Sequence, residues 1–357
     1  MFKLESTVKG IDQLDKEFLL KAEAHLNNLT KPVGSLGQLE ELAKRIAGIK
    51  RTLKPVLKNK VIFTCAADHG VTEEGVSAYP REVTAQMVLN FLKGGAAVNV
   101  LANCVGARVI VVDMGVAEKL KVKNLKARVF KDKKINFGTK NMAQGPAMER
   151  EEAVKSIEAG IEVFEEEFKR GIDIAGTGDM GIGNTTASTA VTAALIGGKI
   201  EELTGRGTGI DDQGLIKKIE VIKKALAVNK PDTNDPIDVL SKVGGFELGG
   251  LTGIILAAAC RKVPVVLDGF ISGASALLAF NIEPKVRDYL IASHHSVERG
   301  HQAILSHLKL RPLLNLDMRL GEGTGAALAF HLAEASVRIM REMATFKSAG
   351  VSEKADL

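Results

Sequence analysis

The sequence predicts an α/β protein with a doubly wound, mostly parallel sheet of Rossmann-like type and a smaller helical domain formed from the N- and C-terminal segments. The central part of the chain contains recurring apolar runs of strand length. Most of these runs precede a stretch with helical character, whereas both ends of the chain show only helical periodicity. Continuous apolar strands that alternate with helices are typical of a parallel sheet covered on both faces.

The N-terminal segment is expected to be helical. An apolar stripe recurs there at spacings of three and four residues, and its members are Leu39, Leu42, Ile46 and Ile49. This spacing places them on one helical face. The segment KPVGSLG at 31–37 interrupts the preceding helix, because proline and glycine disfavour a helix interior.

The apolar runs of the central region are expected to be the strands of the sheet. They are VIFTCAAD (61–68), ARVIVVDMG (107–115), IDIAGTGDMGIG (172–183), VPVVLDGF (263–270) and LLNLDMRLGEG (313–323). We assign residues 56–324 to a large α/β domain that carries the active site. Residues 1–55 and 325–357 are assigned to the small helical domain. Ligands of such sheets bind beyond the carboxyl ends of the strands, where glycines and acidic residues collect in this sequence.

Composition and charge indicate a globular protein without a nucleic-acid partner. Apolar residues make up 45% and charged residues 25% of the 357 residues, which is typical of a globular protein. The net charge of +5 is spread along the chain except for a lysine-rich segment at 119–134. That segment contains one aromatic residue, so we interpret it as an exposed basic loop and expect no nucleic-acid partner.

The termini and the cysteines predict a cytoplasmic protein. The N-terminus lacks the apolar core of a signal peptide, and no uncharged apolar run reaches the roughly 20 residues that span a bilayer. We therefore expect no membrane partner. Cys65, Cys104 and Cys260 are far apart and show no CxxC spacing, which indicates reduced thiols rather than disulfides or a zinc site.

The clearest local signal is GTGDMGIGNTT at 176–186, between a predicted strand and a predicted helix. Glycines let a backbone approach a ligand closely, and the free N–H groups at a helix start favour a phosphate. A tight turn with a good helix cap is the simpler alternative.

The same loop also satisfies the GxGxxG pattern of dinucleotide-binding sites through Gly176, Gly178 and Gly181. A ribose-binding acid should then follow a second apolar strand. Glu201 and Glu202 lie near the required distance, but no such strand precedes them. The sequence therefore does not favour a nicotinamide-dependent dehydrogenase.

Two further glycine loops carry charged residues. GRGTGIDD at 205–212 precedes a helix with Lys217 and Lys218, and basic groups beside a flexible loop suit a phosphate or carboxylate. RLGEGTG at 319–325 places Glu322 between two glycines, where no neighbouring side chain covers it. Enclosure by a substrate would raise the pKa of such a carboxyl toward that of a useful base. Solvated turns are the alternative for both.

The histidine-rich run SHHSVERGH at 293–301 is a weaker candidate. His294 and Glu298 would lie four residues apart if the run were helical, but no second cluster completes a metal site, and we expect no metal. Asp68 and His69, at the end of the first predicted strand, are interpreted as turn or supporting residues.

Taken together, these segments resemble the nicotinate-nucleotide–dimethylbenzimidazole phosphoribosyltransferase family, which makes α-ribazole phosphate for cobalamin-type cofactors. The resemblance covers nearly the whole chain. Its motifs, in order, are KPVGSLGQLE (31–40), ADHGVTEEGVSAYPREVTAQMV (67–88), GTKNMAQGPAM (138–148), GDMGIGNTT (178–186), GRGTGIDD (205–212), GGFE (244–247), LDGFISGA (267–274), HHSVERGH (294–301) and RLGEGTGAA (319–327).

The resemblance implies site residues motif by motif. Glu322 matches the general base of the family, and Asp179 stands where the family pattern GEMGIGNTT has a glutamate, so its side chain is one methylene shorter. The positions that match substrate-binding residues are Gln86, Gly181, Gly183, Asn184, Thr185, Gly207, Lys218, Asp268, Ser296, Arg319, Leu320 and Gly321. Lys217 is the alternative to Lys218. Residues 77–79 fall near Gln86, where the family lines its base pocket.

The resemblance also implies the reaction and the partners. The substrates are nicotinate mononucleotide and a benzimidazole-type base, and no cofactor takes part. A homodimer is implied in which the partner helps to close each site, with a heteromer of related chains as the alternative. A phenol or purine acceptor, and a non-catalytic nucleotide-binding subunit, are the alternative functions.

Overall fold

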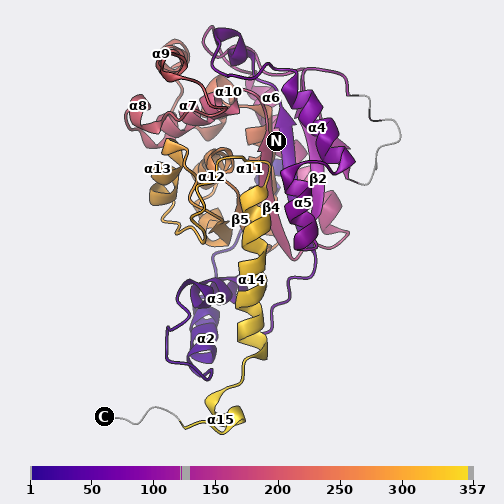
Figure 1. The fold of residues 1–357 in the computed structure, drawn as a ribbon, viewed down its shortest axis with the longest axis vertical. Coiled ribbons are helices and arrows are strands. Elements are labelled where there is room, and N and C mark those ends of the chain that lie inside the picture. The colour runs from indigo at the N-terminus through magenta and orange to yellow at the C-terminus, as the bar shows by residue number, and fades with distance from the viewer. Residues whose placement is uncertain (1, 121, 123–128, 353–357) are drawn as a thin grey trace.

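The computed structural model describes residues 2–120, 122 and 129–352, and its central sheet confirms the predicted α/β class (Figure 1). Within the described residues all pairings in this sheet are parallel, and the strand order is β3-β2-β1-β4-β5-β6. The strands are β1 (Lys60–Ala67), β2 (Arg108–Gly115), β3 (Phe130–Asp132), β4 (Ile174–Met180), β5 (Val265–Leu267) and β6 (Leu290–Ala292).

The strand order places a crevice at the middle of the sheet. The chain runs outward from β1 through β2 to β3, returns to β4 beside β1, and then runs outward in the other direction. Where the order reverses, between β1 and β4, the loops leave the strands in opposite directions and open a ligand crevice at the carboxyl ends. The glycine loop that follows β4 begins at this point.

Four of the predicted strands are confirmed as β1, β2, β4 and β5, but the strand expected at 313–323 is wrong. That segment makes one isolated parallel bridge, between Leu314 and His294. Leu316 and Leu320 are 53% and 58% exposed, so the run lacks the two buried faces of a central strand. The strands β3 and β6, which contain three residues each, were not predicted.

Helices cover both faces of the sheet, as a doubly wound fold requires. Val61, Phe63 and Cys65 of β1 point into one core cluster, and Ile62 and Ala66 point into the other. On the first side lie α6 (Arg150–Phe168), α7 (Asn184–Ile196), α8 (Ile200–Leu203), α9 (Asp212–Asn229), α10 (Pro236–Val243), α11 (Phe246–Cys260), α12 (Phe270–Ile282) and α13 (Arg299–His307). On the second side lie α4 (Val83–Lys93), α5 (Ala97–Cys104) and the first half of α14 (Thr324–Glu342).

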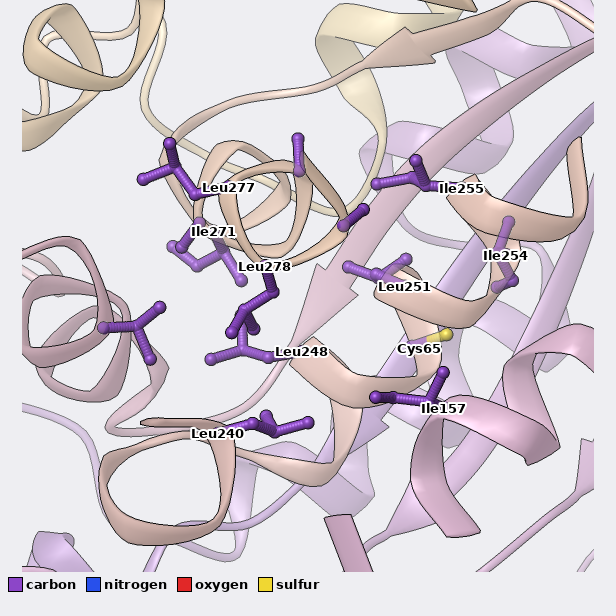
Figure 2. Packing of buried hydrophobic residues seen from close by; sticks show 14 of the residues in the cluster. Cys65, Ile157, Leu240, Leu248, Leu251, Ile254, Ile255, Ile271, Leu277 and Leu278 are labelled. Carbon is purple, nitrogen blue, oxygen red and sulfur yellow. The ribbon is translucent and has the colours of Figure 1, made fainter. Parts of the chain in front are cut away.

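The helix α11 forms the centre of the larger core. It is apolar on all sides, and its residues from Phe246 to Ala259 are buried, as expected for a helix packed between a sheet and other helices. Figure 2 shows Leu248 and Leu251 of α11 among side chains from α6, α10 and α12. Glycines bring α6 and α11 close together, since a Cβ on Gly253 would lie 1.9 Å from the carbonyl oxygen of Ile157. In the described part of the chain, no helix has the length and apolar character needed to cross a membrane.

The helices α2 (Lys16–Asn27) and α3 (Gln38–Lys50) pack beside the second half of α14, away from the sheet (Figure 1). They form a separate cluster with Ala22, Leu26, Ala43, Ala47 and Met340. The short helix α15 (Phe346–Ala349) follows α14. By contrast, α1 (Phe2–Lys9) packs against α6 and α11. The domain boundaries at 55 and 324 remain a prediction.

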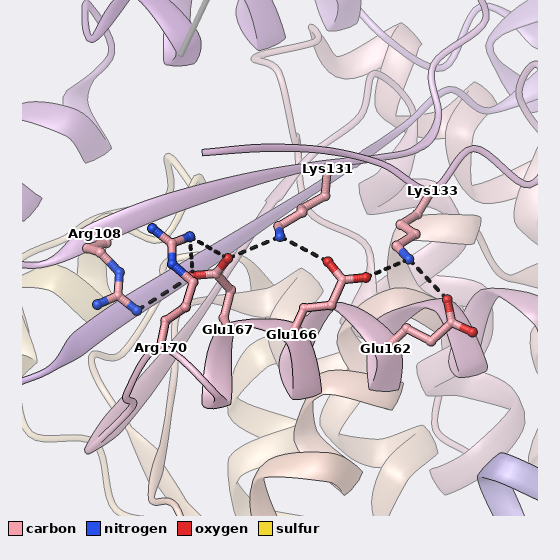
Figure 3. A network of polar contacts seen from close by, with 7 residues as sticks. All are labelled: Arg108, Lys131, Lys133, Glu162, Glu166, Glu167 and Arg170. Atoms are coloured by element: carbon pink, nitrogen blue, oxygen red, sulfur yellow. Dashed lines mark hydrogen bonds and ion pairs between the residues drawn. The ribbon is translucent and has the colours of Figure 1, made fainter. Parts of the chain in front are cut away.

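The lysine-rich segment 119–134 is described only in part, since residues 121 and 123–128 lie outside the described residues. Three of its described lysines form ion pairs. The Nζ atoms of Lys131 and Lys133 lie 2.9 Å from Glu166 on α6 (Figure 3), and Nζ of Lys134 lies 2.9 Å from Asp113 on β2.

Candidate active site

A cavity of about 710 Å³ lies at the carboxyl ends of the central strands and collects most of the predicted site residues. The residues that line it come from the segments 79–87, 179–185, 207–208, 269–271, 294–298 and 319–322. A second cavity, of about 460 Å³, lies between the α2–α3 region and residues 309–313, and its lining contains none of the predicted site residues. The first cavity is therefore the candidate site.

Glu322 has an unusual backbone conformation at the mouth of the sheet. Its φ of 64° is left-handed, and the flanking Gly321 and Gly323 have φ of 84° and 104°. A left-handed conformation is uncommon for a side-chain-bearing residue and is found where the surroundings impose it, often at functional sites. Two contacts impose it here. The Thr64 hydroxyl on β1 donates to the Glu322 carbonyl at 2.9 Å, and Gly178 on β4 leaves room for that carbonyl, because a Cβ there would lie 2.2 Å away.

The Glu322 carboxylate is buried without a cationic partner. Its Oε2 accepts a hydrogen bond of 3.3 Å from the Val98 amide at the start of α5, and it forms no ion pair with any residue that the structure describes. Burial raises the pKa of Glu322, and the Val98 N–H opposes that rise. A carboxylate that lines a cavity with a raised pKa has the properties of a general base.

Asp179 lies at the end of β4, beside the Glu322 loop. A Cβ on Gly321 would lie 3.2 Å from Asp179 Oδ2, so that glycine allows the two acidic segments to approach. The Asn184 amide donates to Oδ2 at 3.0 Å. Burial and the nearby carboxylates of Asp268 and Glu247 raise the pKa of Asp179 well above its ordinary value. Several carboxylates thus lie close together at the site. Their negative charges repel one another, so their simultaneous ionisation is disfavoured.

Asp268 lies behind the cavity wall, although we expected it among the residues that contact substrate. Its carboxylate accepts from the amides of Gly323 and Gly325, at 2.9 and 2.7 Å. It thereby caps the start of α14, where Gly323 has no side chain for this role. Burial raises the pKa of Asp268 to about 7, although these backbone N–H groups favour its ionised form. Asp268 therefore fixes the loop that carries Glu322.

The β4–α7 loop forms one end of the cavity with Gly181, Asn184 and Thr185. Gly181 is required because a Cβ there would lie 2.4 Å from the carbonyl oxygen of Ala67. Gly183 has a φ of 92° and begins α7 without a side-chain cap. The Asn184 and Thr186 amides donate to the carbonyls of Gly181 and Gly183, both at 3.0 Å, which leaves the Thr185 amide in the first turn of α7 available to an anion.

The glycines of the GxGxxG pattern have a different role from that in a dinucleotide site. Gly176 and Gly178 lie within β4, not in a turn after it. A Cβ on Gly176 would lie 3.0 Å from Cβ of Ala326 on α14. These glycines thus let α14 and the Glu322 loop pack directly on the strand.

Lys218, rather than Lys217, belongs to this end of the site. Lys218 is buried, and its ammonium group donates to the Thr185 hydroxyl at 2.8 Å and to the Gly205 carbonyl at 3.2 Å. Lys217 is exposed. Burial lowers the pKa of Lys218 to about 8, while Glu298 opposes that shift.

The 205–209 loop joins the two ends of the cavity. The Gly207 amide donates to Glu298 Oε1 at 3.0 Å, and its carbonyl accepts from Arg319 at 3.1 Å. Thr208 bonds the Ser77 hydroxyl at 3.1 Å and accepts from the Ala78 amide at 3.0 Å. The loop thus positions Arg319 near the anion-binding end and residues 77–78 near the opposite end.

The opposite end is apolar. It is lined by Tyr79, Val83, Met87 and Leu320. The predicted Gln86 is exposed on α4 and does not line the cavity, because the helix turns Val83 and Met87 toward it instead. An apolar wall of this kind suits a flat heterocycle.

The histidine-rich run lines the remaining wall with His294, Ser296 and Glu298. The helical spacing considered for His294 and Glu298 is wrong, because α13 begins only at Arg299. Across the described ranges, no group of three or more His, Cys, Asp or Glu residues is arranged to hold a metal ion. The His301 ring accepts from the Ser296 amide at 3.0 Å and fixes this wall.

Sequence reasoning missed His294 and Glu298 as lining residues and Glu247 as a supporting residue, whereas it had interpreted His69 as a turn or supporting residue. His69 Nε2 lies 2.8 Å from Glu247 Oε1, directly beneath the glycine loop, since a Cβ on Gly181 would lie 3.4 Å from that nitrogen. Burial alone would lower the pKa of His69, but Glu247 outweighs it and raises that pKa. Their presence in ADHG and GGFE was the only signal in the sequence.

Comparison with known proteins gives the same family throughout. A family model described as "Phosphoribosyltransferase" matches residues 11–351. The chain is 56% identical over 351 residues to a nicotinate-nucleotide–dimethylbenzimidazole phosphoribosyltransferase from Desulforudis audaxviator (strain MP104C), with 98% of each chain covered. It is 55% identical over 356 residues to the protein of the same name from Roseiflexus sp. (strain RS-1), with 100% of each covered. The crystal structure of CobT from Thermus thermophilus matches with a TM-score of 0.91 at 47% identity, covering 95% of this chain and 100% of that one.

Proposed function

Because this chain belongs to the nicotinate-nucleotide–dimethylbenzimidazole phosphoribosyltransferase family, we propose that Glu322 is the general base of its reaction. The enzyme transfers phosphoribosyl from nicotinate mononucleotide to 5,6-dimethylbenzimidazole or a related base. The products are α-ribazole 5'-phosphate, for the lower ligand of a cobamide, and nicotinate. One observation supports the base assignment above all: a buried carboxylate without a cationic partner lines the cavity between two glycines.

The leaving group needs no acid. The pyridine nitrogen of nicotinate mononucleotide is already cationic, and it departs neutral when the bond to the anomeric carbon breaks. The electron pair of that bond goes to the nitrogen. No described acid at this site therefore has to donate a proton to nicotinate.

The incoming base needs one proton acceptor. An imidazole nitrogen attacks the anomeric carbon with its lone pair, and the other ring nitrogen then loses its proton. Glu322, with its raised pKa, accepts that proton. Attack on the face opposite to nicotinate converts the β-nucleotide into the α-nucleotide.

Asp179 is proposed to stabilise the sugar in the transition state. In the transition state the anomeric carbon is far from both the leaving and the attacking nitrogen, so the ribosyl group carries positive charge. A carboxylate directed at the ribosyl group stabilises that charge. The Asn184 amide holds the Asp179 carboxylate at 3.0 Å, which fixes its direction despite the shorter side chain.

The anion-binding end is proposed to hold the phosphate. The Thr185 amide at the start of α7 attracts an anion. Lys218 holds Thr185, and Arg319 holds Gly207, so both cations position loop atoms and add positive charge. Gly183 and Ser296 complete this wall through backbone geometry and a hydroxyl group.

The apolar end is proposed to hold the heterocycle between Val83 and Met87 of α4 and Leu320. Gln86, which the resemblance implied for the base pocket, is exposed outside this wall, so we assign to it no contact with the bound base. A phenol or a purine as acceptor is the alternative that a panel of acceptors tests. A non-catalytic nucleotide-binding subunit would release no nicotinate with any of them.

A homodimer and a cytoplasmic location complete the proposal. Tyr79 and Leu320 at the cavity are 56% and 58% exposed, so a second chain packed there would shield apolar surface. A heteromer with a related chain is the other outcome of a measurement of solution mass. Free Cys65, Cys104 and Cys260 suit a reducing compartment.

The reaction is tested with purified protein, nicotinate mononucleotide and a panel of benzimidazoles, purines and phenols. We expect nicotinate release only with an acceptor, and a product whose mass and NMR coupling identify an α-linked nucleotide. Release of nicotinate without an acceptor, or a β-linked product, would contradict the proposed mechanism.

A further inference from the structure

We propose that His294 accepts a hydrogen bond at Nε2 from a hydroxyl group of the bound ribose and thereby selects ribonucleotides over deoxyribonucleotides. The inference rests on the proposed function, because it assigns a role within the same site.

His294 is built into the cavity wall. It follows β6, is 1% exposed and belongs to the cavity lining. Gly325 makes room for its ring, and Gly269 lies in ordinary contact distance of the other edge. A Cβ on Gly325 would lie 2.1 Å from Nδ1, and a Cβ on Gly269 would lie 3.8 Å from Nε2. The ring is therefore held between the start of α14 and the β5–α12 loop.

The hydrogen bonds of Ser293 determine the tautomer of His294. The Ser293 hydroxyl donates its hydrogen to the carbonyl oxygen of Asp268 at 2.9 Å, since a carbonyl can only accept. The same oxygen lies 3.0 Å from Nδ1 of His294 and must accept there. Nδ1 therefore carries the proton, and Nε2 keeps its lone pair.

Nε2 has no partner among the described residues, so it is an available acceptor in a buried wall. The ring also stays neutral. Burial, and then the neighbouring His295, lower the pKa of His294 to about 4. The nearby ring of His301, with its centroid 6.1 Å away, has a pKa lowered to about 3 by burial and the other histidines. A neutral wall avoids repulsion of the cation-like sugar.

The chemistry of the nucleotide identifies the donor. At neutral pH, nicotinate mononucleotide has an ionised carboxylate, a pyridinium without N–H and an ionised phosphate. Its only strong hydrogen-bond donors are the two ribose hydroxyls. The Asp179 and Glu322 carboxylates suit the reacting carbon and the incoming base. Of the other acceptors in the lining, Glu298 Oε1 accepts from the Gly207 amide and the Ser296 hydroxyl accepts from the Glu298 amide, so His294 is left to bind a hydroxyl.

The test compares nicotinate mononucleotide with its 2'-deoxy and 3'-deoxy analogues, in binding by calorimetry without acceptor and in kcat/KM. The wild-type enzyme should disfavour one analogue by about 30-fold, because a buried acceptor is then left unpaired. In His294→Phe, which keeps a ring but removes the acceptor, that preference should fall to about 2-fold. His294→Gln offers an oxygen near the position of Nε2 and should restore part of the preference. His295→Phe, next to it but outside the lining, should keep all of it.

The outcomes separate this inference from the proposed function. If wild-type enzyme binds nicotinate mononucleotide and releases nicotinate, but His294→Phe discriminates like wild type, the inference is overturned and the function stands. If the wild type neither binds nor reacts, both fail. Should His294→Phe not fold, His294→Leu serves instead, because it also removes the acceptor nitrogen. An undiminished preference for ribose in that variant would also overturn the inference.

Discussion

Two groups of acidic residues in this molecule differ in how their charge is compensated. On α6, Glu162, Glu166 and Glu167 face a set of basic side chains from β2, β3, the segment after β3 and the turn that follows α6 (Figure 3). Glu167 is fully buried, yet Lys131 lies 3.1 Å and Arg170 2.8 Å from its carboxylate. Each acid of this row therefore has a cationic partner.

At the cavity and directly behind its wall, Asp179, Asp268 and Glu322 form no such pairs among the described residues. Their partners are an amide side chain or backbone N–H groups. The pKa values differ accordingly. Hydrogen bonds from Lys3 and Lys133 lower the pKa of Glu162, whereas burial raises the pKa of Glu322. Ion pairs neutralise the carboxylates of the α6 row, which stabilise the fold. Among the described residues, no ion pair neutralises Glu322, which is proposed to accept a proton.

The largest expected effect comes from Glu322→Gln, which keeps the size of the side chain but removes the base. We expect kcat to fall about 1000-fold, as for loss of a general base. Glu166→Gln, in the paired row, should leave kcat unchanged. Nicotinate release at saturating substrates measures both. A Glu322→Gln enzyme that keeps more than about a tenth of wild-type kcat would refute the assignment.

Lys218→Met should give the next largest effect, because it removes the cation that holds Thr185 and Gly205. We expect KM for nicotinate mononucleotide to rise about 50-fold, the effect of losing charge-assisted hydrogen bonds. Lys217→Met is the matched control, since that side chain is exposed. Equal effects in both variants would show that the lysine assignment is wrong.

Glu167→Gln tests the paired row through stability. Lys131 and Arg170 are 19% and 40% exposed at their side chains and remain partly hydrated without Glu167. The free energy of unfolding should therefore fall by about 2 kcal/mol, less than for a fully buried pair. Denaturant unfolding measures it, with kcat unchanged. The exposed Glu151→Gln on the same helix should stay within about 0.5 kcal/mol of wild type.

The pH dependence of stability should show the smallest effect. The raised pKa values of Asp179 and Asp268 mean that the folded state binds more protons between roughly pH 4 and pH 7, so stability falls as pH rises. The lowered pKa of Glu162 acts in the other direction and only at lower pH, and its carboxylate is 38% exposed and screened.

Thermal unfolding at pH 5.5 and at pH 7.5 measures how far the stability falls as the pH rises. The fall in Tm should be about 2 °C smaller in Asp179→Asn than in wild type. Glu162→Gln should keep the wild-type slope. An Asp179→Asn protein with the wild-type slope would contradict the account of uncompensated burial at the site.

The sequence predicted the parts of the molecule that depend on local pattern. The apolar runs of β1 and β4 and the glycines around Glu322 can be identified from the local sequence, because they do not depend on contacts with distant segments. Lys218 was also accessible, because it lies on one helical face with Val221, Ile222 and Ala225, all buried. That periodicity distinguishes it from Lys217.

Other features depend on packing between distant segments. The contacts of α4 with the sheet determine which face of the helix lines the cavity. These contacts turn Met87, and not Gln86, toward it. The capping role of Asp268 requires α14 to begin beside β5.

The most direct test is a structure of Glu322→Gln with nicotinate mononucleotide and 5,6-dimethylbenzimidazole bound together, since this variant should trap both substrates. The account predicts that the side-chain carbonyl oxygen of residue 322 lies about 3 Å from the ring N–H of the base. It also predicts that the attacking nitrogen faces the anomeric carbon. If another acceptor occupied that position and residue 322 pointed away, the proposed base would be wrong.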